Sequence, residues 1–367
     1  MQIGVTKEIK NHEYRVGLTP QGVAELVRRH HFVLIERNAG AAIGFSDDRY
    51  VAAGAQIAPS ADDVFAAADM IVKVKEPQPV ECKKLRPGQI LFTYLHLAPD
   101  PEQTRLLIES DVVAIAYETV TDDHGGLPLL APMSEVAGRM SIQAGAHALE
   151  KAQGGLGVLL SGVPGVPPAN VLVLGGGVVG INAARIALGM GAQVTVFDVS
   201  LSRLKELDNL YGPRLMTCYS SRGAIEQVLP DADLVIGGVL VPGAAAPKLI
   251  TRDMLKLMKQ GSVIVDVAID QGGCVETSRA TTHQDPTYVV DGVVHYCVAN
   301  MPGGVARTST LALTNATLPF VIELANKGYR RAMDENKHLR NGLNIHHGAV
   351  TYEAVAHALG YAYTAVI

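Results

Sequence analysis

The sequence predicts an α/β fold with two doubly wound parallel-sheet domains, one of which is inserted into the other. Short apolar runs alternate with helical patterns along most of the 367 residues, which is typical of βα units. That length suits two domains of ordinary size. The helical patterns that close the chain cover no strands of their own, so we expect them to return to the first domain. This domain is therefore expected over residues 1–130 and 306–367, with residues 131–305 inserted and a cleft between the two domains.

The first region is expected to alternate strands and helices up to about residue 130. One helix should span Pro20–His30, with Thr19 as its N-cap and Pro20 at the first helical position. Another is expected over Asp100–Glu109. The expected strands are Ile3–Val5, Val33–Glu36, Met70–Val74, Ile90–Tyr94 and Val112–Tyr117.

The second region is expected to be flanked by two long helices, Ser134–Gln153 and Thr308–Asn326, the latter kinked at Pro319. A proline-rich link, Ser161–Asn170, follows the first of them. The segment from Thr308 to the C-terminus is expected to be entirely helical. The expected strands of this region are Val171–Leu174, a run that ends on Asp198, Leu215–Cys218, Leu234–Gly237, Val263–Val267 and His295–Val298.

The stretch from Val171 to Asp198 indicates a dinucleotide site, and hence a Rossmann-like fold. A strand, a Gly-x-Gly-x-x-Gly turn, a helix, a second strand and an acid follow one another with the spacing that such a site needs. Gly175 permits the tight turn, Gly177 lets a pyrophosphate approach the backbone, and Gly180 lets the helix pack near the strand. The helix N-terminus attracts the phosphates. A glycine turn alone is weak evidence, but the complete context favours cofactor binding over a merely structural turn.

The acid that ends the second strand also predicts which cofactor is used. Asp198 is placed to accept hydrogen bonds from the adenosine ribose and would repel a 2′-phosphate, which favours NAD over NADP. Arg203 lies nearby in the sequence and would soften that preference if it faced the ribose, but pairing with a phosphate or exposure to solvent is the commoner outcome.

Composition excludes several other classes of protein. The net charge of −5 and the 18% content of charged residues indicate no basic surface for nucleic acid. The first residues carry charge where a signal peptide has an apolar core, and no apolar run reaches the roughly 18–20 residues of a membrane span. We therefore expect a cytoplasmic protein without a membrane partner. The four cysteines have no metal-ligand spacing and are expected to be reduced thiols: Cys82, Cys218, Cys274 and Cys297.

Polar residues at strand ends are the candidates for chemistry, because ligands of open α/β sheets bind there. Lys75 ends one apolar run, His96 follows another, and the loop after the first strand carries Lys7, Glu8 and Arg15. Asp266 and Asp270 follow a strand of the second region. Each of these residues alone is more often a solvated charge, a satisfied structural group or a turn cap. Together they suit hydride transfer on a small acid, since Arg and Lys neutralise a carboxylate and His moves a proton.

The motifs taken together resemble the family of L-alanine dehydrogenases and pyridine nucleotide transhydrogenase α-subunits, over essentially the whole chain. The match to the saccharopine dehydrogenases is more distant. Compared with the transhydrogenases, this chain has no membrane spans and keeps the histidine of LHLA. The motifs, in chain order, are GVTKEIKNHEYRVGLTP, VKVKEP, FTYLHLA, LLAPMSEVAGRMS, SGVPGV, LGGGVVG, GSVIVDVAIDQGGCVET and HYCVANMPG.

The resemblance implies an NAD-dependent oxidoreductase of amino-acid catabolism that converts L-alanine and water reversibly to pyruvate and ammonium. It implies that Arg15 and Lys75 grip the substrate carboxylate, that His96 is the general acid and base, and that Asp270 is the second catalytic residue. It also implies a homohexamer. The positions that match cofactor contacts of the family are Ser134, Gly175, Gly177, Val178, Val179, Gly180, Asp198, Arg203, Ser220, Val239, Leu240, Val267, Ala268, Ile269, Asp270, Arg279, Val298, Ala299, Asn300 and Met301.

One departure from the family's pattern concerns metal binding. Some relatives bind a divalent cation through a Glu and a His four residues apart on the helix after the insertion. Here the second position is Lys327, four residues after Glu323, and lysine does not ligate a metal at neutral pH. An i,i+4 ion pair is the expected alternative, and no metal is expected there.

Two other functions remain open from the residues alone. A dehydrogenase for another small amino or 2-oxo acid would have a similar site, because one methylene changes selectivity by only about 1–3 kcal/mol. A catalytically inactive NAD(H)-binding protein would keep the glycine turn but would have no need of Arg15, Lys75, His96 and Asp270 together.

Overall fold

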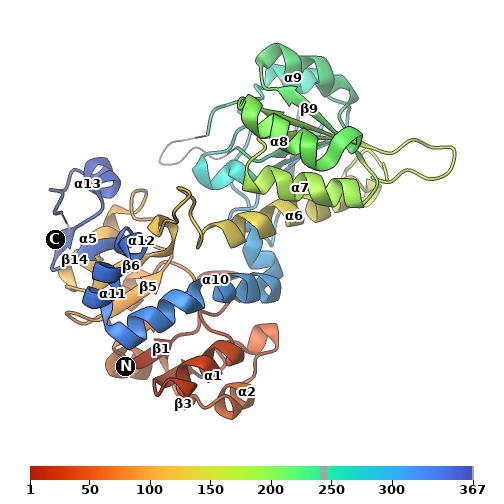
Figure 1. Cartoon of the computed structure of the whole chain (residues 1–367). Coiled ribbons are helices and arrows are strands. Elements are labelled where there is room, and N and C mark those ends of the chain that lie inside the picture. The colour runs from red at the N-terminus through yellow and green to blue at the C-terminus, as the bar shows by residue number, and fades with distance from the viewer. Residues whose placement is uncertain (240–245, 366–367) are drawn as a thin grey trace. The chain divides into compact units, whose positions relative to one another are not determined.

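A computed structural model describes residues 1–239 and 246–365 (Figure 1). The chain forms two compact units. Unit 1 consists of Met1–Met133 and Ala306–Ile367, and unit 2 of Ser134–Val305. Unit 1 is thus discontinuous in sequence, and its first boundary lies inside helix α6, Ala131–Ala148. No helix in the described part of the chain has the length and apolarity to cross a membrane.

Unit 1 is built on an eight-stranded sheet with the order β15-β14-β6-β5-β4-β1-β2-β3. The five strands expected from the sequence are present: β1 and β2 are one residue longer than expected, and β4, β5 and β6 are one or two residues shorter. Neighbours from β6 to β3 are parallel. The bounds are β1 Gln2–Val5, β2 Phe32–Glu36, β3 Gln56–Ala58, β4 Met70–Val72, β5 Ile90–Thr93, β6 Val113–Ala116, β14 Leu343–His346 and β15 Ala349–Val350.

The expectation of an entirely helical C-terminal segment was wrong. Strands β14 and β15 form an antiparallel hairpin, and β14 adds antiparallel to the β6 edge of the sheet. The hairpin turns through His347 and Gly348, whose φ angles of 49° and 68° are both positive, as a two-residue turn of this kind requires. Strands this short, with polar residues between the apolar ones, have little sequence signal of their own.

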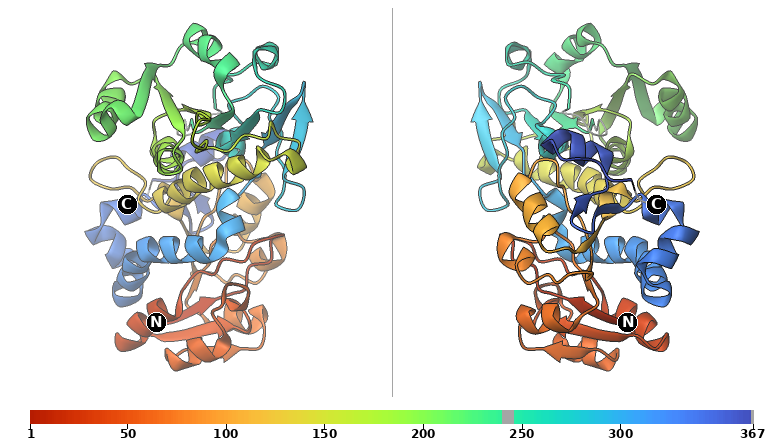
Figure 2. Two further views of the ribbon diagram at one scale, coloured as in Figure 1. Left: turned by 90° about the vertical axis from the view of Figure 1, so that its right-hand side faces the viewer. Right: turned by 90° about the vertical axis from the view of Figure 1, so that its left-hand side faces the viewer.

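The helices of unit 1 cover its sheet. Two of them, α1 and α5, begin where the sequence predicts, to within one residue. The Thr19 side chain accepts a hydrogen bond from the backbone N–H of Gly22 and caps α1. Asp100 is the N-cap of α5 rather than its first residue. In both views of Figure 2 the blue α10 lies beside the red and orange N-terminal elements of the same unit. The bounds are α1 Pro20–Arg28, α2 Asp47–Ala52, α3 Ala61–Ala67, α4 Pro79–Cys82, α5 Pro101–Glu109, α10 Ala306–Lys327, α11 Tyr329–Glu335, α12 Lys337–Arg340 and α13 Glu353–Leu359, with short 3₁₀ helices at Ala41–Ile43 (η1) and Tyr117–Thr119 (η2).

Unit 2 is built on a seven-stranded sheet with the order β12-β13-β11-β10-β7-β8-β9. The chain runs from β7 outward to β9 and then crosses to β10 on the other side of β7. This reversal creates a topological switch point beside β7, where such sheets bind ligands. The bounds are β7 Asn170–Leu174, β8 Gln193–Asp198, β9 Leu215–Tyr219, β10 Leu234–Gly237, β11 Val263–Asp266, β12 Thr287–Val290 and β13 Val293–Tyr296.

Strand β13 begins and ends two residues before the strand expected over His295–Val298, because it is the second arm of a hairpin that the sequence analysis missed. Its partner β12 is antiparallel, and the turn between them is Asp291–Gly292, with φ angles of 49° and 83°. An Asp-Gly pair between apolar runs is a strong hairpin signal.

The helices of unit 2 include the one that follows the glycine turn, α7. The long helix expected over Ser134–Gln153 is α6 followed by a separate 3₁₀ turn, η3. The bounds are α7 Val178–Gly189, α8 Leu201–Tyr211 and α9 Arg222–Val228, with 3₁₀ helices at Lys151–Gln153 (η3), Gly212–Arg214 (η4), Leu229–Asp231 (η5), Asp253–Leu257 (η6), Val267–Gln271 (η7) and Met301–Val305 (η8).

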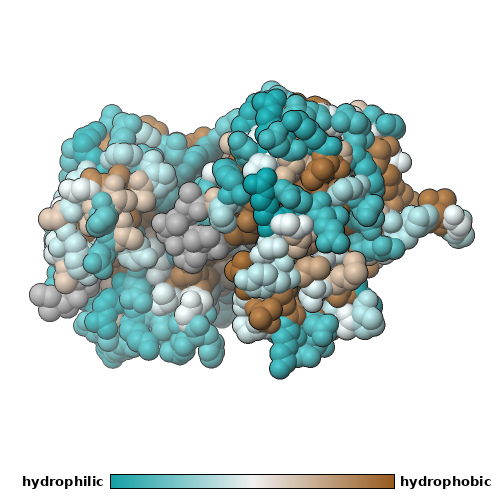
Figure 3. Space-filling view, turned by 90° about the horizontal axis from the view of Figure 1, so that it is seen from above, coloured by the Kyte–Doolittle hydropathy of each residue, from teal (hydrophilic) through white to brown (hydrophobic). Residues whose placement is uncertain are grey.

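The proline-rich link after α6 is a projecting loop. Val163 and Val166 pair across it as an isolated bridge, and their side chains are 54% and 57% exposed. Figure 3 shows this projection, with hydrophobic surface, at the right of the molecule.

The packed interior is aliphatic, as the low aromatic content predicts, and its apolar side chains come mainly from strands buried on both faces. All four cysteines are free thiols: Cys82, Cys274 and Cys297 are buried, and Cys218 is half-buried. No disulfide joins these cysteines, in agreement with the expected free thiols.

Candidate functional site

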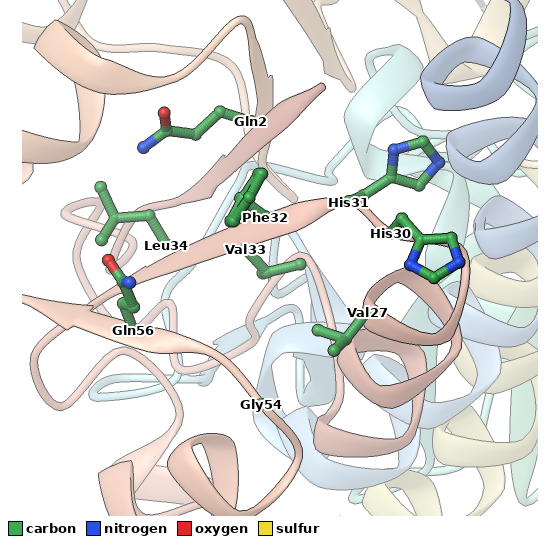
Figure 4. A pocket seen from close by; sticks show the side chains of 9 residues that line it. All are labelled: Gln2, Val27, His30, His31, Phe32, Val33, Leu34, Gly54 and Gln56. Atoms are coloured by element: carbon green, nitrogen blue, oxygen red, sulfur yellow. The ribbon is translucent and has the colours of Figure 1, made fainter.

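A pocket in unit 1 lies away from the candidate residues. It is lined by Gln2, Phe32 and Gln56, which begin strands β1, β2 and β3, together with the end of α1 (Figure 4). These are the amino ends of the strands. Ligands of open α/β sheets bind at the carboxyl ends of the strands, and the candidate residues of unit 1 lie at that opposite edge.

Three candidate residues follow the carboxyl ends of neighbouring strands in unit 1. Arg15 lies in the loop after β1, Lys75 follows β4, and His96 follows β5, and these strands are adjacent in the sheet. The Arg15 loop runs against the end of β4, because a Cβ at Gly17 would lie 2.5 Å from the carbonyl oxygen of Val72. The fold therefore gathers these three basic side chains at one edge of the sheet.

Arg15 is buried, with 2% of its surface exposed, and is held by Glu13. Its Nε and Nη2 donate to the two carboxylate oxygens of Glu13 at 2.7 and 2.6 Å, and Nη1 lies 3.2 Å from Sδ of Met133. Burial alone would lower the pKa of Arg15, but the hydrogen bonds and charge of Glu13 outweigh it and raise the pKa. The guanidinium is thus charged and fixed in orientation.

Lys75 lies at the rim of this edge, with its Nζ 3.9 Å from Oε2 of Glu76. Its backbone is tied to β5, since Oγ1 of Thr93 donates to the Lys75 carbonyl at 3.0 Å. Lys10 forms a hydrogen bond with the other oxygen of Glu76. Burial tends to raise the pKa of Glu76, but the charges of Lys75 and Lys10 outweigh it and the pKa is lowered. The 3.9 Å separation leaves Nζ of Lys75 without a close hydrogen bond to that carboxylate.

A buried ion cluster lies beneath Lys75. Nζ of Lys73 donates to Glu8 at 3.1 Å and to Glu81 at 2.8 Å, and the Lys73 side chain is fully buried. Burial would lower the pKa of Lys73, but the two carboxylates raise it. Glu8 also accepts from the backbone N–H groups of Val74 and Lys75, at 2.7 and 3.3 Å. Glu8, a candidate from the sequence, therefore has a structural role: it binds Lys73 and fixes the backbone at the carboxyl end of β4.

His96 stands on a left-handed backbone, with φ of 48°, and 43% of its side chain is exposed. Its ring stacks on that of Tyr94, with centroids 5.7 Å apart and planes at 9°. The Tyr94 hydroxyl donates to the carbonyl of Leu129 at 2.5 Å, and burial raises the pKa of Tyr94 well above its usual value. Tyr94 also interacts electrostatically with Arg15, so the same side chain is coupled to the guanidinium and in contact with the imidazole.

The glycine turn of unit 2 has the geometry that the sequence predicts. Gly175 has φ of 96°, and a Cβ there would lie 3.0 Å from the carbonyl oxygen of Gly238. A Cβ at Gly180 would lie 1.7 Å from the carbonyl oxygen of Gly175, so only glycine lets α7 start this close to β7. No heavy atom lies within 4 Å of a Cβ built at Gly177, and no side chain caps α7. Its first N–H groups therefore suit a phosphate.

Asp198 ends β8 and contacts the glycine turn. Its Oδ2 accepts from the N–H of Gly176 at 2.7 Å and its Oδ1 from the N–H of Ser200 at 2.8 Å. Arg203 neither points freely into solvent nor needs a phosphate as partner: Nε donates to the Gly176 carbonyl at 2.6 Å, and Nη1 pairs with Glu206 at 2.6 Å. Both side chains therefore brace the turn, and the guanidinium is partly engaged within the protein.

The two aspartates after β11 have different environments. Asp266 is fully buried and accepts from the Ser278 hydroxyl at 2.6 Å and the Val275 N–H at 3.2 Å. It therefore ties the following loop to the strand. Asp270 lies in η7 and is exposed. Of the two acids that the sequence offered, Asp270 is the one that a ligand can reach.

The other cofactor candidates lie mostly at the carboxyl edge of the same sheet. The guanidinium of Arg279 lies over the ring of Tyr288, 4.0 Å from the centroid. Leu240 lies outside the described residues. The rest are Ser134 in α6, Val178–Gly180 in α7, Ser220 after β9, Val239 after β10, Val267–Asp270 in η7, and Val298–Met301 after β13.

The ion pair expected in place of a metal site is present. Nζ of Lys327 lies 2.8 Å from Glu323 and 2.8 Å from Glu335. Among residues 1–239 and 246–365, no group of three or more His, Cys, Asp or Glu side chains is arranged to hold a metal ion.

Sequence reasoning missed three residues that hold the candidates: Glu13, Lys73 and Glu118. Glu118 accepts from the backbone N–H groups of Leu95 and His96, the latter at 2.6 Å. For Lys73 and Glu118 the only signal in the sequence was a charged residue at or just beyond the end of an apolar run, as in IAYE for Glu118. Glu13 lies in a polar loop and had no such signal.

Comparison with known proteins agrees with these features over the whole chain. The domain families "Alanine dehydrogenase/PNT, N-terminal domain" and "Alanine dehydrogenase/PNT, C-terminal domain" match residues 4–137 and 141–353. The chain is 62% identical to an alanine dehydrogenase of Halomonas elongata over 363 residues, which cover 99% of this chain and 98% of the relative.

Solved structures give the same result. An L-alanine dehydrogenase has a TM-score of 0.95 and 52% identity, covering 98% of this chain and 99% of its own. A transhydrogenase from Sinorhizobium meliloti has a TM-score of 0.84 and 25% identity, covering 96% and 100%. The chain therefore belongs to the alanine dehydrogenase/PNT family.

Proposed function

We propose that this protein is an alanine dehydrogenase, which catalyses the reversible oxidative deamination of L-alanine to pyruvate and ammonium with NAD as cofactor. The observation that carries the proposal is the 62% identity to an alanine dehydrogenase over 99% of the chain. Arg15 and Lys75 at the carboxyl edge of the unit 1 sheet support it, because two cationic side chains suit a small carboxylate substrate.

The residues of unit 2 fit a dinucleotide. The open space at Gly177 and the uncapped α7 would receive the pyrophosphate, and Asp198 would receive the adenosine ribose. NAD is proposed over NADP because a carboxylate at this position repels a 2′-phosphate. The engagement of Arg203 with Glu206 and Gly176 reduces its availability to offset that repulsion.

Bond chemistry assigns the roles of the side chains. Arg15 and Lys75 would hold the substrate carboxylate, with the guanidinium already fixed by Glu13. A nicotinamide cofactor, when bound, would supply the acceptor for the hydride that leaves the substrate Cα. The substrate nitrogen must first lose a proton so that its lone pair can form the iminium, and the His96 imidazole is the proposed base.

Water must then add to the iminium to form a carbinolamine, from which ammonia leaves. His96 would move the protons of these steps, and the exposed Asp270 would orient the water and balance the cationic iminium. In the reverse direction the same groups return the protons to the substrate.

Two further properties are proposed from the resemblance. Self-association as a homohexamer follows the family pattern. A cytoplasmic location is supported by the four free thiols, which a reducing compartment preserves.

The proposed reaction is tested by following absorbance at 340 nm with NADH, ammonium and a panel of 2-oxo acids. Oxidation of NADH with pyruvate as the preferred acid is the expected result. Preference for a different 2-oxo acid would show that the amino-acid substrate is not alanine. Binding of NADH without turnover on any acid would favour a catalytically inactive NAD(H)-binding protein.

We predict that Asp198→Ser will relax the preference for NAD. Loss of a hydrogen bond to a charged group costs about 1.5–3 kcal/mol, so KM for NADH should rise roughly tenfold or more. KM for NADPH should fall, because the carboxylate no longer repels the 2′-phosphate. Initial rates with each cofactor check this, and Asp208→Ser on the exposed face of α8 is the matched control. An unchanged ratio of the two KM values would contradict the role of Asp198.

A further inference from the structure

We propose that Glu118 is a positioning residue, which holds the backbone of Leu95 and His96 in the conformation that presents the His96 imidazole. This inference rests on the proposed function, in which His96 is the acid and base. It assigns to Glu118 no contact with substrate or cofactor.

The backbone at His96 needs external support. Its φ of 48° is in the left-handed region, where an L-residue other than glycine is disfavoured because Cβ approaches the carbonyl oxygen. Such a residue persists only where its surroundings determine its conformation, and it is often found at functional sites. The left-handed residue here directs the imidazole out of the buried segment formed by Leu95 and Leu97.

Glu118 supplies that support from the neighbouring strand. It lies in η2, directly after β6, and β6 pairs in parallel with β5, which leads to His96. The N–H of His96 donates to Oε1 at 2.6 Å, and the N–H of Leu95 donates to Oε1 and Oε2 at 3.1 and 3.2 Å. From the other side, Nε2 of Gln103 donates to the Leu95 carbonyl at 3.0 Å. The peptide that carries the histidine is thus clamped between two side chains.

The platform that carries Glu118 is itself rigid. The adjacent Tyr117 is fully buried, and its hydroxyl donates to the carbonyl of Lys73 at 3.0 Å. Its ring packs edge-on against Tyr94, with centroids 5.1 Å apart, and Tyr94 stacks on His96. The segment Tyr117–Glu118 therefore positions both parts of His96: Glu118 holds the backbone, and Tyr117 supports the ring through Tyr94.

The carboxylate acts through the backbone rather than through the imidazole. Oε1 lies 3.9 Å from Nδ1 of His96, which is too long for a hydrogen bond. Within the described ranges, no lysine or arginine lies within salt-bridge distance of Glu118. Its oxygens are instead committed to peptide N–H groups, which is the arrangement expected of a group that fixes a loop.

Two substitutions of Glu118 separate the effect of its side-chain length from the effect of its charge. Glu118→Gln keeps an oxygen at the same distance to accept from both N–H groups but removes the charge. Glu118→Asp keeps the charge but shortens the side chain by one methylene, which leaves the two N–H groups beyond reach. Glu109→Asp on the exposed face of α5 is the matched control.

The expected result is that Glu118→Gln keeps kcat for pyruvate reduction within a few-fold of the parent, whereas Glu118→Asp lowers it by roughly 10- to 100-fold, the scale of a displaced catalytic group. The fluorescence-measured Kd for NADH and the KM for pyruvate should change little in either variant. The opposite order, with Glu118→Asp the more active, would show that charge matters and overturn the proposal, as would equal rates for both variants.

A double substitution tests whether Glu118 acts through His96. Because a positioning residue has nothing to position once the imidazole is gone, His96→Ala/Glu118→Asp should be no slower than His96→Ala. A further loss of about tenfold or more in the double variant would indicate general structural damage and contradict the proposal. If His96→Ala itself keeps near-normal turnover, the role proposed for His96 fails, which is a separate outcome from a failure of Glu118.

Discussion

Replacing His96 with alanine is expected to lower kcat for alanine oxidation and pyruvate reduction by about 10²- to 10⁴-fold, the usual contribution of a general acid and base. The imidazole is the proposed group that removes the proton from the substrate nitrogen and serves the later addition of water. It follows β5 in unit 1 and belongs to a different compact unit from the glycine turn. We therefore expect the affinity for NADH to be retained.

The measurement combines initial rates at 340 nm with titration of NADH by its own fluorescence. The chain contains no tryptophan, so the protein contributes little emission to that signal. His124→Ala, a substitution at an exposed histidine, is the control for loss of an imidazole elsewhere. Near-normal turnover in the His96 variant would contradict its assignment as the acid and base.

Removal of either Arg15 or Lys75, the two cations proposed to bind the substrate carboxylate, should raise KM for pyruvate. A hydrogen bond to a charged group is worth about 1.5–3 kcal/mol, which corresponds to roughly 10- to 100-fold in binding. Lys75→Ala and Arg15→Lys are the informative variants. Lysine keeps the charge of Arg15 but loses the planar fork that binds both Glu13 and a carboxylate, so we expect it to rescue only part of the effect.

Lys10→Ala is the control for the Lys75 variant, because Lys10 pairs with the same Glu76 as Lys75 but is more exposed. Its removal should leave KM for pyruvate close to that of the parent. An unchanged KM in Lys75→Ala, measured at saturating NADH and ammonium, would exclude Lys75 from substrate binding.

The parts of the fold that follow from local rules were predictable. Apolar runs of several residues gave β7, β10 and β11 nearly to the residue, because buried parallel strands need continuous apolar side chains. The glycine turn was predictable for a related reason: a Cβ at Gly180 would overlap a carbonyl oxygen, so the geometry leaves glycine as the only choice. The hairpin at His347–Gly348 was missed because its strands are only four and two residues long. The one at Asp291–Gly292 was missed although its Asp-Gly turn is a recognisable signal.

The candidate site was predictable only in outline. A strand end is visible in a sequence, so Arg15, Lys75 and His96 could be placed at one edge of a sheet. The groups that hold them could not, because Glu13, Glu118 and the Lys73 cluster are defined by which side chains meet in three dimensions. Asp266 and Asp270 show the same limit, since both follow one strand and only burial separates the structural acid from the accessible one.

The antiparallel strand β14 has a consequence for how the chain is made. Its partner β6 leaves the ribosome early, but β14 is synthesised near the end, after all of unit 2. During that interval the nascent chain carries an open β6 edge, and such edges invite pairing with other chains. Unit 2 is continuous in sequence and can fold as soon as it emerges, whereas unit 1 must wait for the last residues. The insertion therefore imposes an order of maturation in which unit 2 is finished before unit 1.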